Sequence, residues 1–247
     1  GLIAASTGNH GQSVAYAGRE FGVPVVVAVP EDANRDKVAA MEALGARVEH
    51  HGADYDDARE WAESLAAEEG YRYVHSANEP RLIAGVGTAG LEVVEELPAV
   101  DTLVCPVGGG SSAAGYCLTA GAVGGADVIG VQAAGADAMY RGFHEGHLDP
   151  QETVATTAEG IASRVPFALT MEVLRERLHD MRRVTDDAIE DAMALCFRED
   201  HLVVEGASAA AVAAALEMGD DLAGRTVVLQ LSGRNVETGK LRRILGA

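Results

Sequence analysis

Three clusters of polar residues carry groups that could do chemistry, and each one directly follows an apolar run. The first is STGNHGQSVA at residues 6–15, where two hydroxyls, a glycine and an Asn-His pair lead into a helix-forming stretch. The second is VGGGSSAAG at residues 107–115, with three glycines and two serines, and the third is SGRN at residues 232–235. Open α/β sheets bind ligands where their strands end, so all three positions are candidates for a binding site.

The glycine-rich cluster favours binding of an anion through the backbone. A loop between a strand and a helix can direct several backbone N–H groups at an anion, and the helix dipole adds positive potential. The loop contains no lysine, so it is not a P-loop of the GxxxxGK[ST] type. It suits the phosphate of an organic cofactor, which amides and hydroxyls alone can bind. The alternative is a structural glycine-rich turn.

A second glycine pattern, GVGTAG at residues 85–90, matches the GxGxxG motif of dinucleotide-binding folds. That motif has to follow a strand directly, whereas NEPRLIA precedes it here and is typical of the first turns of a helix. The acidic residue expected about 20 positions further on is also missing from the required context. We therefore interpret these glycines as sites of close helix packing and reject a nicotinamide-linked dehydrogenase.

The other reactive side chains form no recognisable catalytic or metal-binding arrangement. A lone histidine such as His10, beside Asn and Gly, is more often a hydrogen-bonding group than a base. No Ser/His/Asp arrangement can be argued from spacing, and no cluster of His, Cys and Asp has metal-ligand spacing. Cys105, Cys117 and Cys196 are too scattered for a disulfide framework, which favours a reducing, cytoplasmic compartment.

The charge of the chain restricts its partners. Its 247 residues include 38 acidic and 19 basic residues, and the net charge of -19 argues against nucleic acid as a partner. No apolar run is long enough to span a membrane, and no signal peptide is visible. Lys37 and Lys240 are the only lysines against 17 arginines, which resembles the proteins of salt-loving microbes. Their carboxylate surfaces stay hydrated and self-repelling in brine. The alternative is an ordinary acidic enzyme.

Apolar runs alternate with helix-forming stretches, which predicts an α/β fold of doubly wound, mostly parallel sheets. Strands are expected at residues 2–5, 23–29, 47–50, 71–75, 102–106, 128–132 and 227–231. Helices are expected at residues 11–21, 35–44, 55–68, 82–96, 113–121, 188–197 and 208–218.

The organisation along the chain predicts two domains, a small one at residues 1–78 and a large one at residues 79–247, because the alternating pattern restarts near residues 78–80. The polar stretch at residues 142–159 is expected to be an irregular excursion over the surface. Since the sequence begins inside an apparent strand, we expect that sheet to lack neighbouring strands and a segment upstream to be missing.

The three clusters, in this order, resemble the fold-type II enzymes that use pyridoxal phosphate, above all the threonine/serine dehydratases and serine racemases. The segments VHSANEPRLIAGVGTAGLEVVEEL, TTAEGIASRVPF, VTDDAIEDAM and VVEGASAAAVAAAL also have counterparts in that family at the expected intervals. The resemblance implies two domains of a tryptophan synthase β-like fold, with the N-terminal part of that fold absent. It also implies pyridoxal 5′-phosphate as cofactor, a small amino acid as substrate and a homo-oligomer, by analogy a dimer.

The resemblance assigns roles to residues of all three clusters. The substrate carboxylate would be bound by the asparagine loop, which comprises Ser6, Thr7, Gly8, Asn9 and His10. The cofactor phosphate would be held by the glycine loop, which comprises Gly108, Gly109, Gly110, Ser111 and Ser112. Asn9 would also reach the 3′-oxygen of the cofactor. Ser232 would meet the pyridine nitrogen, where a neutral hydroxyl need not force ring protonation, and Glu205 would lie near the same end of the ring.

The reaction implied is β-elimination, in which L-threonine or L-serine loses its hydroxyl and its amine to give a 2-oxoacid and ammonia. In this family a lysine forms a Schiff base with the cofactor and removes the α-proton. Neither Lys37 nor Lys240 fits that context, so the catalytic lysine is expected upstream of Gly1. The alternatives are a serine racemase, a sulfhydrylase or threonine-synthase-like enzyme, and a non-catalytic ligand-binding relative without the lysine.

Three departures from the family pattern bear on these expectations. Ser111 replaces the fourth glycine of the loop and Arg234 turns SGGN into SGRN, which would cost strain if either position needed a positive φ. The racemase branch binds a divalent cation through two carboxylates, where this chain has Gln132 and Ala138, so no metal site is expected. Thr7 stands where that branch has a serine base, which makes racemisation the less expected activity.

Overall fold

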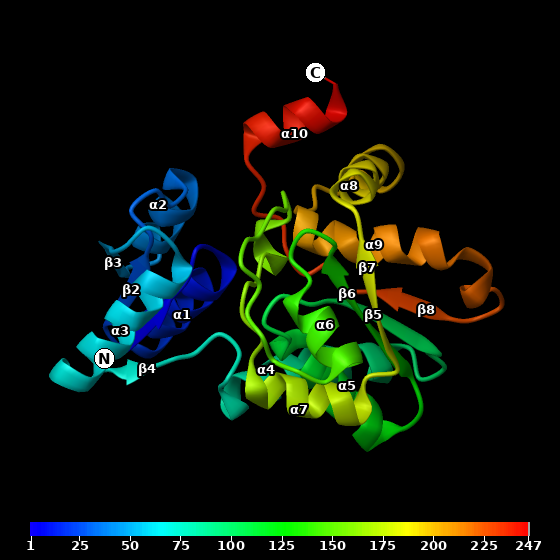
Figure 1. Cartoon of the computed structure of the whole chain (residues 1–247), viewed down its shortest axis with the longest axis horizontal. Helices are drawn as coiled ribbons and strands as arrows, with labels where there is room; N and C mark the ends of the chain where they lie inside the picture. Colours follow the sequence, from blue (N-terminus) through cyan, green and yellow to red (C-terminus); the bar gives the residue numbers. More distant parts are fainter. Residues whose placement is uncertain (247) are drawn as a thin grey trace. The chain divides into compact units, whose positions relative to one another are not determined.

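The computed structural model describes residues 1–246 of the chain, which divides after Ser76 into two compact units. Each unit contains its own four-stranded sheet, in which all neighbouring strands are parallel (Figure 1). The alternation of strands and helices in the sequence leads to this architecture, because parallel neighbours need a crossover between them. The predicted α/β class is confirmed.

Unit 1, residues 1–76, has the strand order β3-β2-β1-β4. Its elements, in chain order, are β1 (Leu2–Ala5), α1 (Asn9–Phe21), β2 (Val25–Val29), α2 (Arg35–Ala43), β3 (Arg47–His50), α3 (Tyr55–Glu69) and β4 (Arg72–Tyr73). Strand β1 is central, since Leu2 pairs with Val25 on one side and with Arg72 on the other. The expectation that this sheet lacks neighbours for its first strand is therefore wrong.

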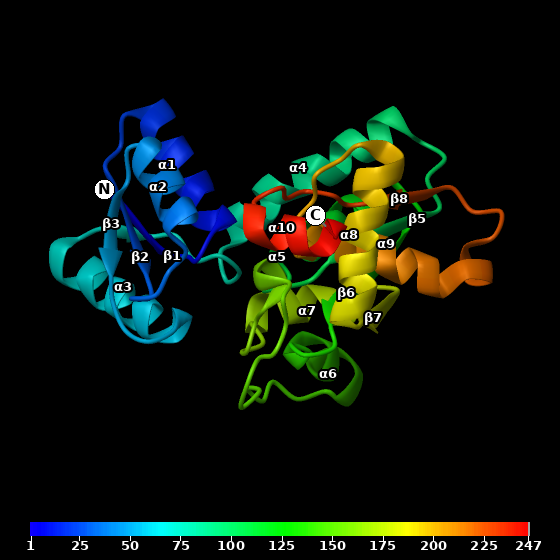
Figure 2. The same ribbon diagram turned by 90° about the horizontal axis from the view of Figure 1, so that it is seen from above.

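The two faces of the first sheet bury alternate residues of the same strands. Ala4, Val25 and Val27 face a cluster that includes Val14 of α1 and Met41 of α2. Ile3 and the other inward residues of the opposite face pack against α3 (Figure 2). Because both faces are covered by helices, β1 and β2 are nearly continuous apolar runs rather than alternating ones.

Unit 2, residues 77–247, has the strand order β7-β6-β5-β8. Its strands are β5 (Thr102–Pro106), β6 (Asp127–Ala133), β7 (Asp180–Val184) and β8 (Val227–Leu229). Its helices are α4 (Pro80–Glu96), α5 (Ser111–Val123), α6 (Ala138–Glu145), α7 (Ala168–Arg177), α8 (Asp186–Asp200), α9 (Gly206–Met218) and α10 (Thr238–Leu245), with short turns η1 (Glu159–Ile161) and η2 (Gly219–Leu222). Helices α4, α5 and α7 cover one face of the sheet, and α8 and α9 cover the other (Figure 1).

Four elements of unit 2 are missing from the sequence prediction, namely β7, α6, α7 and α10. Strand β7 reads DMRRV and lies at an edge of the sheet with exposed Arg182 and Arg183, so its hydrophobic signal is weak. Helix α6 occupies the beginning of the stretch 142–159 that was expected to be irregular. These helices are short or strongly polar, which leaves little periodicity to read.

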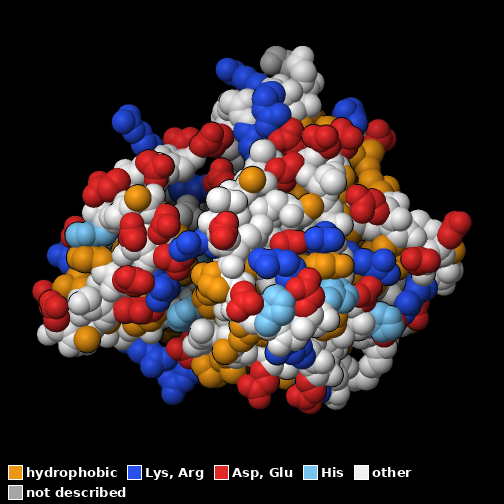
Figure 3. Space-filling model, viewed as in Figure 1, with side chains coloured by type: hydrophobic (Ala, Val, Ile, Leu, Met, Phe, Trp, Pro, Cys, Tyr) orange, Lys and Arg blue, Asp and Glu red, His pale blue; other side chains and the backbone are white. Residues whose placement is uncertain are grey.

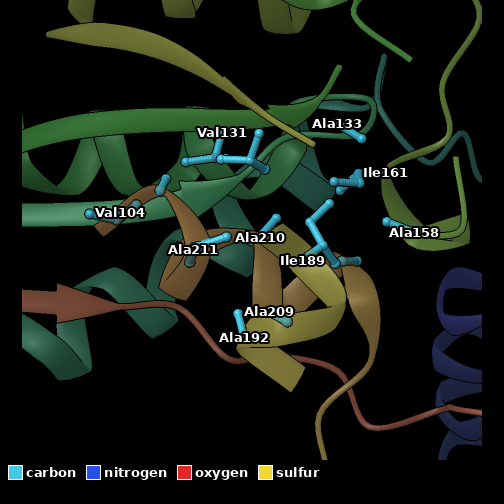
Figure 4. Packing of buried hydrophobic residues seen from close by; sticks show 14 of the residues in the cluster. Val104, Val131, Ala133, Ala158, Ile161, Ile189, Ala192, Ala209, Ala210 and Ala211 are labelled. Carbon is cyan, nitrogen blue, oxygen red and sulfur yellow. The ribbon is translucent and has the colours of Figure 1, made fainter. Parts of the chain in front are cut away.

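Helix α9 is packed against the sheet through alanines. Ala209, Ala210 and Ala211 are fully buried in a cluster with Val104 of β5 and Val131 of β6 (Figure 4). Ile161 of η1 and Ile189 of α8 belong to the same cluster (Figure 4). Small side chains allow the helix to lie close to the strands, which brings its N-terminus to the edge of the sheet where the strands end.

The GVGTAG glycines lie inside α4, and two of them, Gly87 and Gly90, serve helix packing as predicted. A Cβ on Gly87 would lie 3.2 Å from the carbonyl oxygen of Gly115 in α5, and Thr119 donates a hydrogen bond to the Gly87 oxygen at 2.8 Å. A Cβ on Gly115 would lie only 2.7 Å from the backbone nitrogen of Gly87. The close contact of α4 with α5 therefore depends on glycines on both helices.

We expect Gly115→Ala to lower the free energy of unfolding by about 1–3 kcal/mol, because the new methyl group meets backbone that cannot rotate away. The matched control is Gly85→Ala on α4, where a Cβ meets nothing within 4 Å. That change should stabilise by about 0.5–1 kcal/mol through the usual preference of a helix for alanine. Urea titrations of both variants test this, and equal effects would contradict the packing role of Gly115.

Asp and Glu side chains are spread over the face of the molecule drawn in Figure 3. Some are neutralised locally, as where Arg59 contacts Asp56 and Glu63 on α3, but the chain carries 38 acidic against 19 basic residues. Self-repulsion of these charges opposes the compact state. Within residues 1–246 no helix is both long and apolar enough to cross a membrane.

We therefore expect the urea midpoint to rise as sodium chloride is added, because salt screens repulsion between exposed carboxylates. A parallel series with sucrose at matched osmolality controls for general exclusion of solute from the protein surface. A midpoint that falls, or stays constant, between low and molar salt would contradict a carboxylate surface adapted to brine.

Candidate active site

The asparagine loop, residues Ser6–His10, lies where β1 ends and α1 begins. Ser6 continues the sheet by donating its backbone N–H to Ala28 at 3.0 Å, and its buried hydroxyl accepts the N–H of Gly8 at 3.1 Å. Gly8 is the N-cap residue of α1, and no side chain caps this helix in the described part of the chain. Thr7 and Asn9 are exposed beside it. The loop thus presents polar side chains at the positive end of a helix, which favours an anion.

His10 is held by the backbone and carries no charge at neutral pH. Its Nε2 lies 2.9 Å from the carbonyl oxygen of Val74. A carbonyl can only accept, so Nε2 carries the hydrogen and the neutral ring has Nδ1 as its acceptor. Burial lowers the pKa of His10 below its usual value of 6.5, and the bond to Val74 only partly opposes this. The His10 ring is therefore held in its neutral form, which is consistent with a hydrogen-bonding group rather than a cation.

The glycine loop, residues Gly108–Ser112, runs from the end of β5 into the first turn of α5, and the positions of its three glycines have no room for a side chain. A Cβ on Gly108 would lie 2.9 Å from the carbonyl oxygen of Gly160, and one on Gly109 would lie 2.9 Å from the Cβ of Ala77. Gly110 has a left-handed φ of 86°, which favours glycine. Ser111 follows within the helix, and His201 is the one non-glycine residue with positive φ among residues 1–246. The replacement of the fourth glycine by serine therefore costs no backbone strain.

Hydrogen bonds fix both ends of the glycine loop. Thr170 of α7 donates to the carbonyl oxygen of Gly109 at 2.7 Å, and Gln230 donates through Nε2 to the hydroxyl of Ser112 at 2.8 Å. The Ser112 oxygen thus accepts a bond within the protein, and its hydrogen can be donated elsewhere. No side chain caps α5 within residues 1–246, so its first-turn amides remain donors. This arrangement can hold a phosphate without a cation.

The third cluster lies next to the glycine loop in the sheet order, because β8 pairs with β5 in parallel and both strands end at the same edge. The backbone of Gly233 is held on both sides by Ser208, whose hydroxyl accepts from its N–H at 2.8 Å and donates to its oxygen at 3.1 Å. The buried carboxylate of Glu205 accepts the N–H of Asn235 at 3.1 Å. Ser232 and Arg234 are exposed, and Arg234 has no positive φ, so its presence also costs no strain.

The turn η1 and its surroundings support the glycine loop, and sequence reasoning assigned them no role. Gly160 of η1 lies against Gly108, as its contact distance shows. Just before η1, Thr156 and Thr157 are hydrogen-bonded to α8. The Thr156 hydroxyl and the Thr157 N–H both donate to the carboxylate of Asp186, at 2.6 and 2.9 Å. Lys240 of α10 donates to the carbonyl oxygen of Thr157. The only sign of this role in the sequence was the resemblance of the TTAEG stretch to the family.

The region that corresponds to the metal site of the racemase branch contains guanidinium groups in this chain. Asp137 accepts from Arg141 at 3.1 Å and from Arg183 at 2.6 Å, while the Gln132 oxygen accepts the N–H of Tyr140 at 2.9 Å. Among residues 1–246, no group of three or more His, Cys, Asp and Glu could hold a metal ion. With two arginines on its one carboxylate, this region does not fit a divalent cation.

The comparison with known proteins decides what these clusters belong to. Residues 1–233 match the family described as pyridoxal-phosphate dependent enzyme. The chain belongs to this family. It is 36% identical over 246 residues to the L-threonine ammonia-lyase of Thermotoga maritima, covering 99% of this chain and 61% of that protein. It is 33% identical over 249 residues to the catabolic L-threonine dehydratase of Escherichia coli K12, covering 100% of this chain and 76% of that protein.

Solved structures of the family have the same fold. The processed form of threonine deaminase isoform 2 from Solanum lycopersicum superimposes with a TM-score of 0.93 at 30% identity, covering 99% of this chain and 68% of that one. Maize serine racemase superimposes with a TM-score of 0.92 at 28% identity, covering 98% of this chain and 75% of that one. The predicted fold-type II family is confirmed. The chain spans less than two thirds of the Thermotoga relative.

The neutral state of His10 predicts a specific pH dependence. Its pKa is lowered in the folded protein, so below about pH 6.5 the unfolded chain binds a proton that the folded protein does not. Stability should therefore fall as the pH drops below 6.5. His10→Asn keeps an N–H donor without a titrating ring and should lose less stability than the wild type between pH 7 and pH 5.5.

Denaturant titrations at each pH measure this difference, and NMR of the labelled His10 ring gives the pKa and the tautomer directly. A ring that titrates at or above 6.5 would contradict the lowering of the His10 pKa by burial, and a neutral ring protonated on Nδ1 would contradict the bond to Val74.

Proposed function

We propose that this protein is a pyridoxal-phosphate-dependent ammonia-lyase that eliminates the β-hydroxyl and the amine of L-threonine or L-serine. The products would be ammonia and a 2-oxoacid, 2-oxobutanoate from threonine or pyruvate from serine. The similarity to an ammonia-lyase and a dehydratase that act on L-threonine supports the reaction class. When bound, pyridoxal phosphate draws electrons from the α-carbon of an amino acid, which makes loss of the α-proton and of a β-substituent feasible.

The observation that carries the proposal is the glycine loop. A phosphate needs several fixed donors and close approach of the backbone, and Gly108, Gly109 and Gly110 each occupy a position where a side chain would collide or force an unfavourable φ. Ser111 and Ser112 add hydroxyls at the N-terminus of α5, whose dipole favours an anion. The residues present thus fit the phosphate of the cofactor. In this proposal these five residues hold it through backbone N–H groups and the two hydroxyls.

Ser232 and Glu205 would flank the ring of the cofactor. The loop that carries Ser232 is fixed by the two hydrogen bonds between Gly233 and Ser208, so the serine is displayed from a rigid support. A serine hydroxyl is neutral and does not demand protonation of the ring nitrogen, as a carboxylate would. Glu205 is occupied by the N–H of Asn235, so we assign it to holding this loop beside the ring.

The asparagine loop would bind the substrate carboxylate. Ser6, Thr7, Gly8 and Asn9 present hydroxyl, backbone and amide groups at the N-terminus of α1, and His10 completes the loop as a neutral ring. Asn9 would also contact the 3′-oxygen of the cofactor. In this proposal the lysine that binds the cofactor and removes the α-proton is contributed by a segment upstream of Gly1, and the active protein is a homodimer.

The test is the absorption spectrum of the full-length protein with pyridoxal phosphate, followed by assay of 2-oxoacid and ammonia from L-threonine and L-serine. We expect a visible band of bound cofactor that changes with substrate, and equal amounts of the two products. Ser112→Ala should weaken cofactor binding about 10- to 100-fold, the range for one hydrogen bond to a charged group.

The assay also separates the alternatives. Formation of D-serine without 2-oxoacid would identify a racemase, and cofactor binding without turnover would support a ligand-binding relative. A matched control is Ser64→Ala on α3, which removes an exposed hydroxyl outside the three clusters and should leave cofactor binding unchanged. Absence of any cofactor band in the wild type would overturn the proposal.

A further inference from the structure

The asparagine loop has to attract a carboxylate within an acidic unit. Unit 1 contains 13 acidic and 6 basic residues, so its overall field repels anions. The helix N-terminus supplies only a partial positive charge. The other titratable group of the loop, His10, is kept neutral because burial lowers its pKa. A full positive charge near the loop must therefore come from another element.

Lys37 is the basic side chain that the structure places against this loop. A Cβ on Gly8 would lie 3.6 Å from Cδ of Lys37 and 3.8 Å from its Nζ, so the end of the lysine chain lies beside the glycine. Lys37 is half-buried, and the stem of such a side chain can pack while its ammonium stays at the polar loop.

The backbone of Lys37 is fixed by the cap of α2. The Asn34 side chain accepts the N–H of Asp36 at 2.9 Å and that of Lys37 at 3.2 Å, which holds the first turn in place. This turn follows β2, the strand that pairs directly with β1, so the lysine and the loop stand at the same edge of the sheet. Their proximity is therefore a consequence of the topology and not of a flexible side chain alone.

Three other basic residues of unit 1 form ion pairs away from the asparagine loop. Arg19 contacts Glu20 at the far end of α1, Arg47 contacts Glu49 on β3, and Arg59 contacts acidic residues of α3. None of these three ion pairs involves the asparagine loop.

We propose that Lys37 binds the substrate carboxylate together with the asparagine loop and supplies the positive charge that the loop itself lacks. This inference rests on the proposed function, because it assigns to the same site the cation that selects an amino acid with a free carboxylate. No proton transfer or covalent step is involved. The ammonium acts as a fixed hydrogen-bond donor to an anion, and a charge-assisted bond of this kind is stronger than a neutral one.

The test compares Lys37→Met with Lys37→Arg and with Arg35→Met in the full-length holoenzyme. Arg35 is an exposed residue of the same first turn of α2, so Arg35→Met removes the same charge at a position outside the asparagine loop. We expect Lys37→Met to raise KM for L-threonine or L-serine about 10- to 100-fold, the range for one charge-assisted bond, with a smaller change in kcat. Lys37→Arg should retain most of the affinity, and Arg35→Met should match the wild type.

A second measurement does not depend on turnover. Calorimetric titration with L-alanine and with L-alaninamide compares ligands that differ in the carboxylate, and we expect Lys37→Met to weaken binding of L-alanine alone. An unchanged KM in an active Lys37→Met variant, or equal losses for the acid and the amide, would overturn the role of Lys37 while leaving the lyase intact. A wild type that neither binds L-alanine nor forms 2-oxoacid would overturn both proposals.

Discussion

The polar clusters of this protein depend on the unpaired backbone amides at the points where a parallel strand ends and a helix begins. A helix begins with amides that have no partner within the helix, and the structure treats these ends in two ways. Helices α2, α3 and α8 are closed by the side chains of Asn34, Asp54 and Thr185. Helices α1 and α5 follow central strands and begin at glycines without such a cap. A missing cap lowers stability by about 1 kcal/mol, and at α1 and α5 a bound anion could take the place of the cap.

The absence of a cap is not by itself the mark of a site. Helices α6, α7, α9 and α10 also begin without a side-chain cap in the described part of the chain. What distinguishes α1 and α5 is their place after β1 and β5, which lie inside their sheets, and the support beneath them. For α5 that support is the bond from Thr170 to Gly109 and the bond from Gln230 to Ser112. Position and support, more than the free amides, define the candidate site.

The sequence predicts a strand correctly where the strand is both apolar and buried in the fold. Strands β1 and β5 are buried apolar runs followed by glycine and hydroxyl residues, so both their ends and the loops after them could be located. Strand β7 could not, because it lies at an edge and exposes Arg182 and Arg183. Loop residues are recognisable by type, whereas partners such as Gln230 and Thr170 belong to distant segments and have no local signature.

For the same reason, the sequence did not indicate that Lys37 lies beside Gly8. In the sequence it is an ordinary charge in the first turn of a helix, separated from Gly8 by a whole strand and helix. Only the pairing of β1 with β2 brings these segments to one edge of the sheet. Contacts that depend on the order of strands in a sheet cannot be predicted from local sequence patterns, even when each strand and helix is predicted correctly.

The asparagine loop and the glycine loop use different electrostatics, and under the proposed function the difference follows from what each would bind. The glycine loop uses neutral donors, held rigidly by packing, which suits a cofactor that binds once and stays. Because the donors are already oriented, little entropy is lost on binding. A substrate has to enter and leave at every turnover, and a chain with this excess of carboxylates repels it. In the proposal, the ammonium of Lys37 beside Gly8 would attract the substrate carboxylate without the strong, water-excluding cage that would slow its release.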